Sequence, residues 1–177
     1  MDVSGSVQDE YRLSVAFARA VSYGLDIDHD QARVGAVVFA TDVNGFFYLG
    51  DNTHNREGVI NSLDFFNDGG KTNTPAGLEI VRDALFTAAK GDRPGVPNVL
   101  VVATDGYSNV NAERTPLDAE QLRNDGVTIY CVGVGEAPQL SEINSIASSP
   151  SSEYVLVLIS QGNPEDAADQ LLDRLCR

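Results

Sequence analysis

The chain is poor in the residues that mark several common protein classes. It contains no tryptophan, one methionine and only two cysteines among 177 residues. No apolar run approaches the roughly 20 residues that a membrane-spanning helix needs, so we expect no membrane insertion. No Asn-x-Ser/Thr acceptor for an N-linked sugar occurs, so glycosylation gives no indication of compartment.

Basic residues are also scarce. There are 12 lysines and arginines against 26 aspartates and glutamates, which gives a formal net charge of −14. Nucleic acids and anionic membranes are bound through clustered Lys and Arg, so neither is expected as a partner. An acidic surface also serves solubility alone, and the charge therefore supports cation binding only weakly.

The two cysteines are informative by position rather than by number. Cys131 lies in the apolar run 127–134, which predicts a buried free thiol. Cys176 is the penultimate residue and follows a predicted helix. No second cysteine near residue 1 is available to pair with it.

Predicted strands and helices alternate along the chain, which favours a mostly parallel sheet with helices on both faces. The strands are predicted at 34–40, 46–49, 99–103, 127–134 and 154–159. Most are unbroken apolar runs, as expected for strands covered on both faces. Segment 46–49 follows its predecessor after a short turn-rich stretch, which predicts an antiparallel hairpin and an edge strand. The length and the 42% apolar content fit one domain over 1–177.

Three predicted helices begin with the same signal. Thr74, Thr115 and Asn163 each stand directly before a proline, so each is predicted to cap a helix. Apolar residues recur at helical spacing after Thr74 and after Asn163. The remaining helices are predicted at 8–23, 57–66 and 139–147.

Three loops carry oxygen-bearing side chains in a pattern typical of a metal site. Asp2 and Asp105 supply carboxylates, and Ser4, Ser6 and Thr72 supply hydroxyls. Such hard donors suit Mg²⁺ better than zinc, with Mn²⁺ and Ca²⁺ as alternatives. Asp105 follows a predicted strand, at the sheet edge where ligands of open α/β sheets bind. Each loop alone has a simpler interpretation, namely helix capping by the hydroxyls or a turn closed by Asp105.

These loops, together with Val132-Gly133-Val134-Gly135, resemble the von Willebrand factor type A domain family, which includes integrin I domains and matrix-protein A domains. The resemblance covers essentially the whole chain. It implies a three-layer, Rossmann-like α/β fold with an open, mostly parallel sheet and one antiparallel edge strand. It also implies that the five oxygen donors form the family's metal-ion-dependent adhesion site.

The function that the resemblance implies is adhesion rather than catalysis. The domain would bind an acidic residue of a protein ligand, such as collagen or another matrix protein, through Mg²⁺ in the extracellular space. Gly70, Tyr107 and Glu136 are candidates for the rim that contacts this ligand. The family often has a basic residue after Asp-Gly, whereas here Tyr107 follows Gly106. This departure affects the identity of the partner rather than metal binding.

One element of the family pattern is missing from the sequence. We count five strand candidates where the family has six, and the absent strand should lie at the centre of the sheet, directly before Asp2. We therefore expect an N-terminally truncated domain. The gap would be filled by another chain, by Met1 and Asp2, or not at all. In related matrix domains a cysteine after the last helix pairs with one before the first strand, and Cys176 agrees with that pattern.

Two other classes of function remain open. One is a structural matrix-assembly domain with an idle metal site. The other is a metal- or nucleotide-dependent enzyme, because Gly70-Lys71-Thr72 ends like a phosphate-binding loop, although Phe65 stands where that motif requires glycine. A serine hydrolase is disfavoured because neither Ser4 nor Ser6 lies in Gly-x-Ser-x-Gly, and both histidines lie in polar loops.

Overall fold

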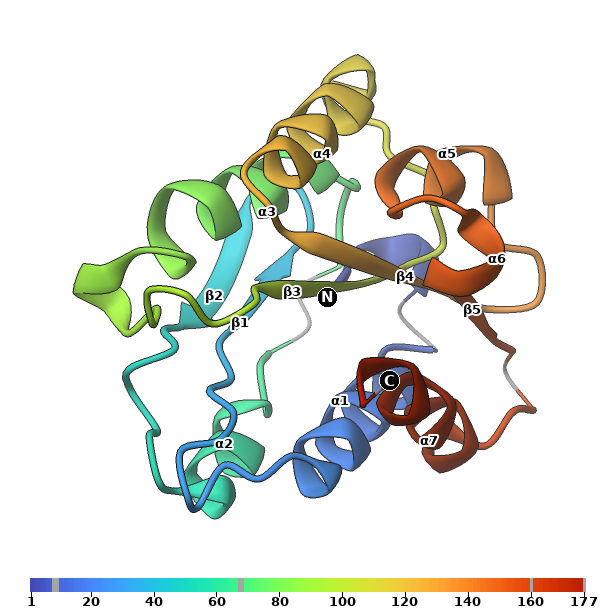
Figure 1. Cartoon of the computed structure of the whole chain (residues 1–177). Helices are drawn as coiled ribbons and strands as arrows, with labels where there is room; N and C mark the ends of the chain where they lie inside the picture. The colour runs from blue at the N-terminus through green and yellow to red at the C-terminus, as the bar shows by residue number, and fades with distance from the viewer. Residues whose placement is uncertain (8–9, 67–68, 160, 177) are drawn as a thin grey trace.

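The computed structural model describes residues 1–7, 10–66, 69–159 and 161–176. Strands form a middle layer with helices on either side (Figure 1). The five strands are β1 (Ala36–Phe39), β2 (Val43–Phe47), β3 (Val99–Thr104), β4 (Thr128–Val134) and β5 (Val155–Leu158). β3, β4 and β5 pair in parallel in that order, while β1 and β2 form an antiparallel hairpin. The predicted fold class and its antiparallel edge strand are confirmed.

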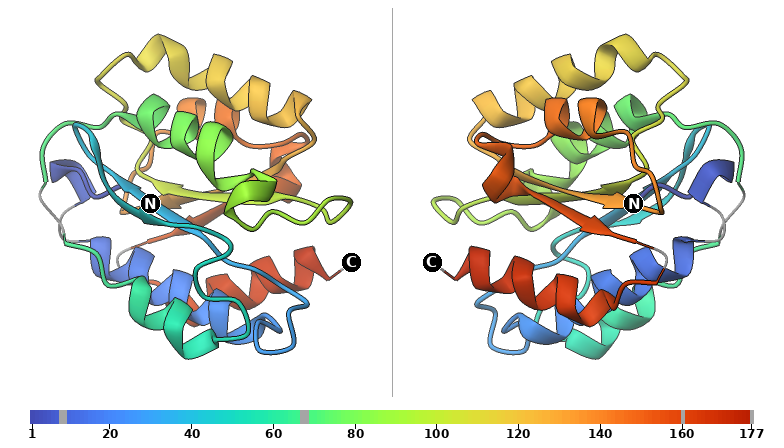
Figure 2. Two further views of the ribbon diagram at one scale, coloured as in Figure 1. Left: turned by 90° about the vertical axis from the view of Figure 1, so that its left-hand side faces the viewer. Right: turned by 90° about the vertical axis from the view of Figure 1, so that its right-hand side faces the viewer.

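The helices divide between the two faces of the strands (Figure 2). On one face lie α1 (Tyr11–Gly24), α2 (Arg56–Ser62) and α7 (Pro164–Leu175). On the other lie α3 (Thr74–Ile80), which continues as the π-helical turn η2 (Val81–Leu85), α4 (Thr115–Asn124) and α5 (Leu140–Ile146). The short elements are η1 (Gly5–Val7), η3 (Ala88–Lys90), η4 (Ala112–Arg114) and α6 (Ser151–Tyr154). In the described ranges no helix has the length and apolar character to cross a membrane.

β4 shows why the apolar runs of this sequence become buried strands. Successive side chains of a strand point to opposite faces of the sheet. Ile129 and Cys131 belong to the core on the α4 and α5 side, whereas Tyr130 and Val132 belong to the core that includes Leu171 of α7. Cys131 is a buried free thiol, as predicted, and burial raises its pKa. Cys176 is also free, and it is exposed.

The first three residues join the hairpin to the parallel strands. The backbone N–H of Asp2 donates to Ala103 O of β3 at 2.9 Å, and that of Val3 donates to Phe39 O of β1 at 2.8 Å. Phe39 in turn donates to Met1 O at 3.1 Å. Met1, Asp2 and Val3 therefore lie between β1 and β3, at the carboxyl ends of these strands. This corresponds to one of the three expectations for the central gap.

Several predicted boundaries are wrong by a few residues. β2 begins at Val43, inside the stretch interpreted as a turn, because a register shift between Val38 and Phe39 lets the hairpin pair closer to its tip. The helix predicted at 57–66 ends at Ser62. Beyond it Phe65 leaves the helix and its carbonyl accepts a hydrogen bond from the Tyr11 hydroxyl at 2.7 Å.

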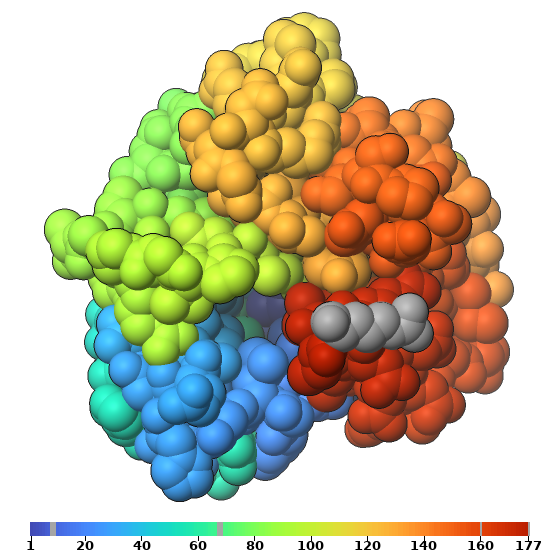
Figure 3. All heavy atoms as spheres, in the orientation of Figure 1, coloured from blue at the N-terminus to red at the C-terminus, as the bar shows by residue number. Residues whose placement is uncertain are grey.

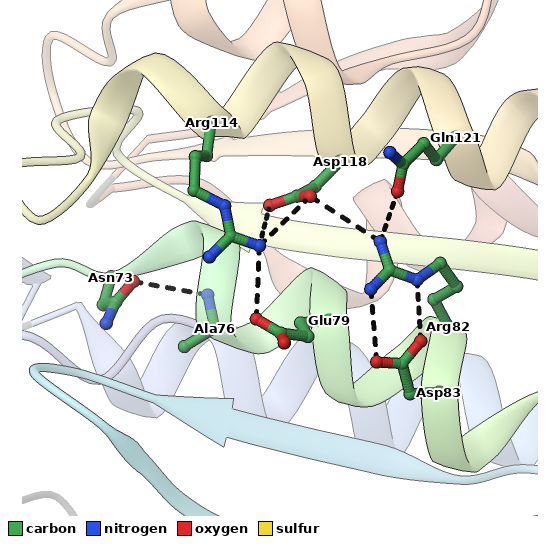
Figure 4. Close-up of polar contacts among 8 residues, drawn as sticks. All are labelled: Asn73, Ala76, Glu79, Arg82, Asp83, Arg114, Asp118 and Gln121. Atoms are coloured by element: carbon green, nitrogen blue, oxygen red, sulfur yellow. Dashed lines mark hydrogen bonds and ion pairs between the residues drawn. The ribbon is translucent and has the colours of Figure 1, made fainter.

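Two of the three predicted caps are also wrong. Thr74 is the first residue of α3, and the preceding Asn73 caps it by accepting a hydrogen bond from the Ala76 N–H at 3.3 Å (Figure 4). Thr115 is likewise the first residue of α4, whose cap position makes no side-chain hydrogen bond. The capping side chain belongs to the residue directly before the first helical residue. Both threonines are themselves the first helical residue, so they cannot cap these helices. Asn163 does cap α7, by accepting from its second residue at 3.2 Å.

Two arginines connect α3 and its π-helical extension to α4 (Figure 4). Arg114 lies 3.3 Å from both Glu79 and Asp118, and Arg82 lies 3.6 Å from the other oxygen of Asp118. Asp118 is only 5% exposed, so its charge requires these two partners. The network fixes α4 against α3, the helix that begins directly after the Thr72 loop.

Candidate metal site

Three hydroxyls form a connected row at the carboxyl end of the strands. Thr72 Oγ1 donates to Ser4 Oγ at 2.9 Å, and Ser4 Oγ lies 3.1 Å from Ser6 Oγ. Ser4 and Thr72 are buried, whereas Ser6 is exposed. The 3₁₀ turn η1 brings the two serines together. The row therefore leads from the protein interior to solvent.

Asp2 lies beside this row and is held at both carboxylate oxygens. Oδ1 accepts the backbone N–H of Ser4 at 2.9 Å, and Oδ2 accepts the hydroxyl of Thr104 at 2.8 Å. The side chain is 1% exposed. Burial raises the pKa of Asp2, the hydrogen bonds from Ser4 and Thr104 oppose this, and the charge of Asp105 raises it further.

Asp105 directly follows β3 and adds the second carboxylate. Its Oδ1 accepts the backbone N–H of Tyr107 at 3.1 Å, so this residue closes its own turn, as the simpler interpretation held. Its main-chain oxygen accepts the Gln139 N–H at 2.7 Å, which fixes the turn to the start of α5. No hydrogen bond from another described residue reaches Oδ2, so this oxygen remains available to a ligand.

The loop that carries Thr72 is held by hydrogen bonds to two other segments. Gly70 O accepts the Gly5 N–H at 2.9 Å, and the Asn109 side chain accepts the Thr72 N–H at 3.1 Å. Gly70 has φ +102°, and a Cβ there would lie 2.7 Å from Thr41 Oγ1. Only glycine fits both this backbone conformation and this close approach. Thr41 and Asn109 carry no sequence signal for such a role, and the prediction did not include them.

A third acidic side chain stands near the site and was also missed. Glu142, in the first turn of α5, accepts a hydrogen bond from Ser108 Oγ at 2.5 Å, and Ser108 Oγ lies 2.5 Å from Thr74 Oγ1. Burial raises the pKa of Glu142, and the charges of Asp105 and Asp2 add to this effect. Glu142 is far from the other loops in sequence, so no local pattern indicated it.

The structure places the predicted rim residues around the same edge. Tyr107 is 48% exposed, and its hydroxyl donates to Ala137 O at 3.3 Å, so its ring lies across the loop after β4. Glu136 belongs to that loop and is exposed. Gly70 is exposed beside the hydroxyl row. Within the described chain Glu136 makes no hydrogen bond or ion pair with the five oxygen donors.

The donor set fits a hard divalent cation. No three His, Cys, Asp or Glu side chains gather in a metal-binding arrangement in the described part of the chain, so the hydroxyls are indispensable to any site here. No arginine or lysine among the described residues forms an ion pair with Asp2 or Asp105. A bound cation would supply the positive charge that these two carboxylates lack.

The structure gives the enzyme alternatives little support. Helix α2, rather than a strand, precedes the Gly70 loop along the chain. His29 is exposed and lies 2.7 Å from Asp26, while His54 is exposed and its ring nitrogen lies 3.4 Å from Asp28 O. Neither histidine contacts a serine of the candidate site.

Comparison with known proteins agrees with the geometry. The family model of the von Willebrand factor type A domain matches residues 1–170. The human collagen alpha-6(VI) chain is 37% identical over 163 residues, and chicken matrilin-1 is 32% identical over 157. These matches cover 89% and 87% of this chain, but only 7% and 31% of the relatives. The chain thus spans well under half of the length of the curated relatives that it matches.

A solved structure with a metal-occupied site shares the fold of this chain. Proximal thread matrix protein 1 from the mussel byssus superposes with a TM-score of 0.86 at 25% identity. It was solved with zinc in its MIDAS motif, the abbreviation for metal-ion-dependent adhesion site. The match covers 99% of this chain and 46% of the mussel protein. The fold and the family match agree, and the chain belongs to the von Willebrand factor type A domain family.

Proposed function

We propose that Asp2, Ser4, Ser6, Thr72 and Asp105 bind a divalent cation, with Mg²⁺ as the preferred ion. The observation that carries this proposal is the row of hydroxyls from Thr72 to Ser6 beside two carboxylates that form no ion pair with a described lysine or arginine. Oxygen donors alone, with few charges, match the preference of Mg²⁺. Mn²⁺ and Ca²⁺ are the alternatives that the same donors accept.

The proposed role of the bound cation is to attract a carboxylate of a protein partner. Only two of the proposed ligands carry a negative charge, so a divalent cation bound there would still attract negative groups. It would therefore accept a carboxylate oxygen of an incoming acidic side chain. Ser6 stands at the accessible end of the site, and Gly70, Tyr107 and Glu136 border it. These features support a non-enzymatic, metal-dependent protein-binding module.

The relatives support a place in the extracellular matrix. The relatives are collagen VI chains and matrilin-1, the mussel protein is named a thread matrix protein, and all match most of this chain. We therefore propose a matrix or adhesion protein as the partner, with collagen as the first candidate. The formal charge of −14 also favours a partner surface that carries basic residues around the acidic contact.

Calorimetric titration with MgCl₂ tests the metal site. The wild-type chain should bind one ion, and Ser4→Ala and Asp105→Asn should each weaken binding by about tenfold or more. Ser22→Ala is the matched control because Ser22 is buried like Ser4 but donates to Ala18 O within α1, away from the site. Equal affinities in wild type and Ser4→Ala would contradict the ligand set. No Mg²⁺ binding at all would favour the structural domain with an idle site.

Binding to immobilised collagen tests the partner. The wild-type chain should bind in MgCl₂ and lose binding in EDTA, and Asp105→Asn should not bind in either buffer. A collagen peptide with glutamate replaced by glutamine should bind no better than buffer. Collagen binding that survives both EDTA and Asp105→Asn would contradict a metal-mediated contact.

A further inference from the structure

A groove of about 1100 Å³ runs along the outer side of α1. On this face of the strands α1 lies between α2 and α7 (Figure 1), and the lining of the groove comes from α1, from α7 and from segment 64–66 after α2. Both neighbours are in contact with α1. A Cβ on Gly24 would clash with Leu172 of α7, and the Tyr11 hydroxyl donates to Phe65 O at 2.7 Å. The groove is therefore built from three segments that support one another.

Much of the groove is lined by small or apolar side chains. Ala16 and Ala20 stand one turn apart on α1, so another backbone can approach this helix closely. Tyr23 follows them on α1 and is 57% exposed. Phe66 contributes from the segment after α2 and is 79% exposed. Two large side chains left in water around one groove indicate an interaction surface.

Helix α7 adds a row of carboxylates to this surface. Glu165, Asp169 and Asp173 are exposed and stand four residues apart, so they lie along one side of the helix. Glu165 and Asp169 line the groove itself, together with Leu172. Figure 3 shows α7, in red, at the surface of the molecule. None of the three carboxylates forms an ion pair with a described residue, so this row is free to attract a basic partner.

The positive charges of the groove belong to α1. Arg19 lies 3.8 Å from Asp64, so that pair is balanced. Arg12 is exposed and forms no ion pair with a described residue. A partner that fits this groove therefore carries basic residues toward α7 and apolar residues toward α1. A second copy of this chain fits poorly, because its formal charge of −14 opposes self-association.

We propose that this groove binds an amphipathic, basic α-helix of another protein. An apolar stripe of that helix packs on Ala16, Ala20 and Tyr23, and lysines or arginines at every fourth position meet Glu165 and Asp169. The 14 residues of α1 give the groove a length of about 21 Å, which accommodates about four helical turns. The charge pattern selects the partner, because like charges at this contact are repelled. No proposed metal ligand lines the groove, so binding there does not depend on the metal site.

Fluorescence anisotropy with two synthetic helices tests the proposal. The first probe is an end-capped peptide of about 16 residues with leucines along one side and lysines at every fourth position beside them. The second probe carries glutamate in place of each lysine. The wild-type chain should bind the lysine peptide at least about tenfold more tightly than the glutamate peptide. The titrations are made in EDTA, so failure of the proposed metal site would leave this result unchanged.

Nuclear magnetic resonance locates the bound peptide. The amide signals of Ala16, Ala20 and Tyr23 should shift when the lysine peptide is added. The signals of Gly70 and Tyr107, at the candidate metal site, should not. Shifts confined to the metal site would contradict binding in the groove.

Charge reversal on α7 separates the groove from the overall acidity of the chain. Glu165→Lys combined with Asp169→Lys should weaken binding of the lysine peptide by about tenfold and strengthen binding of the glutamate peptide. The matched control combines Glu120→Lys with Asp125→Lys. These two exposed residues lie on α4 and directly after it, on the other side of the strands (Figure 2), so this variant has the same net charge and should bind like the wild type.

A substitution on α1 tests the apolar part of the groove. Ala16→Trp fills the groove without changing any charge, and it should weaken binding of the lysine peptide by about tenfold. The charge reversal on α7 keeps the test decisive even if Ala16→Trp does not fold.

Four outcomes would overturn the proposal. No binding of the lysine peptide at millimolar concentration would show that the groove takes no basic helix. Equal affinities for the two peptides would show an apolar surface without charge selection. Equal losses in the α7 and α4 charge variants would show attraction to the whole acidic chain. Dimers in sedimentation without peptide, dissociated by Ala16→Trp, would show that a second copy of this chain is the occupant.

Discussion

Thr104 and Asp2 are 102 residues apart in sequence, yet the Thr104 hydroxyl donates to Asp2 Oδ2 at 2.8 Å in the interior of the protein. The same hydroxyl accepts the Gly106 N–H at 3.0 Å. Thr104 thus orients the buried carboxylate and the turn that carries Asp105 at the same time. Such supporting contacts commonly determine how well the direct ligands hold an ion.

Replacing Thr104 by valine should impair the site without removing a proposed ligand. The Thr104→Val side chain has nearly the same shape, but Asp2 Oδ2 loses its donor and Gly106 N–H loses its acceptor. We expect Mg²⁺ affinity to fall by about tenfold and the free energy of unfolding to fall by about 1–3 kcal/mol. Calorimetric titration and urea unfolding measure the two effects.

Thr115→Val is the matched control for that substitution. Thr115 is equally buried, but its hydroxyl has no hydrogen-bond partner among the described residues. Removing an unpaired buried hydroxyl should leave stability unchanged or raise it by up to about 1 kcal/mol. Equal losses of stability in the two variants would show that the Thr104 hydroxyl has no specific role.

Gly70→Ala should displace the loop that carries Thr72. The substitution places a methyl group 2.7 Å from Thr41 Oγ1 at a φ of +102°. The left-handed backbone alone costs about 1–2 kcal/mol, and the clash should move the Thr72 hydroxyl away from Ser4. We expect loss of stability in urea unfolding together with weaker Mg²⁺ binding.

Gly95→Ala separates the effect of backbone strain from the effect of the clash with Thr41. Gly95 has φ +81°, and nothing lies within 4 Å of a Cβ built there. The Gly95→Ala variant should therefore lose stability through backbone strain alone and keep the Mg²⁺ affinity of the wild type. If Gly70→Ala bound Mg²⁺ as tightly as Gly95→Ala, the position of the loop would not control the site.

Asp30 and Arg33 should make the protein sensitive to acid. Arg33 forms two hydrogen bonds to the Asp30 carboxylate, at 2.8 and 2.9 Å. These contacts lower the pKa of Asp30 from 3.8 to about 2. A lowered pKa stabilises the folded state above the unfolded value, and this contribution is lost as the pH falls from 3.8 toward 2.

Urea unfolding between pH 6 and 2 in wild type and Asp30→Asn measures this contribution. The wild type should be more stable near neutral pH, and the two curves should converge toward pH 2. Asp125→Asn, at an exposed carboxylate after α4, is the control and should follow the wild type. Parallel curves for wild type and Asp30→Asn over the whole range would contradict the assignment to this pair.

Glu142→Gln should weaken metal binding through charge alone. The amide oxygen still accepts the Ser108 hydroxyl, but the negative charge near Asp2 and Asp105 is gone. We expect Mg²⁺ affinity to fall by roughly threefold at low salt, and the difference should shrink in 0.5 M NaCl because salt screens charges that are not in contact. Glu153→Gln, an exposed site on α6, is the control. A loss of affinity that persists in high salt would instead indicate direct contact with the ion.

The contacts that position the site were less predictable than the donors themselves. Asp2, Ser4, Ser6, Thr72 and Asp105 carry a spacing and an order that indicate their chemistry. Asn109, Thr41 and Glu142 carry no such pattern, because their roles depend on which loops meet at the sheet edge. The capping errors at Thr74 and Thr115 have a similar cause, since a one-residue shift of the helix start decides which side chain can reach the first turn.

The sequence by itself determined the family and the alternation of strands and helices, and it predicted the set of oxygen donors, because periodicity, capping residues and short motifs are local properties. Only the tertiary structure decided how the chain uses its first residues. Met1, Asp2 and Val3 pair with β1 and β3 and bring the Asp2 carboxylate to the Thr104 hydroxyl. Hydrogen bonds between residues about a hundred positions apart depend on packing, which local patterns do not report.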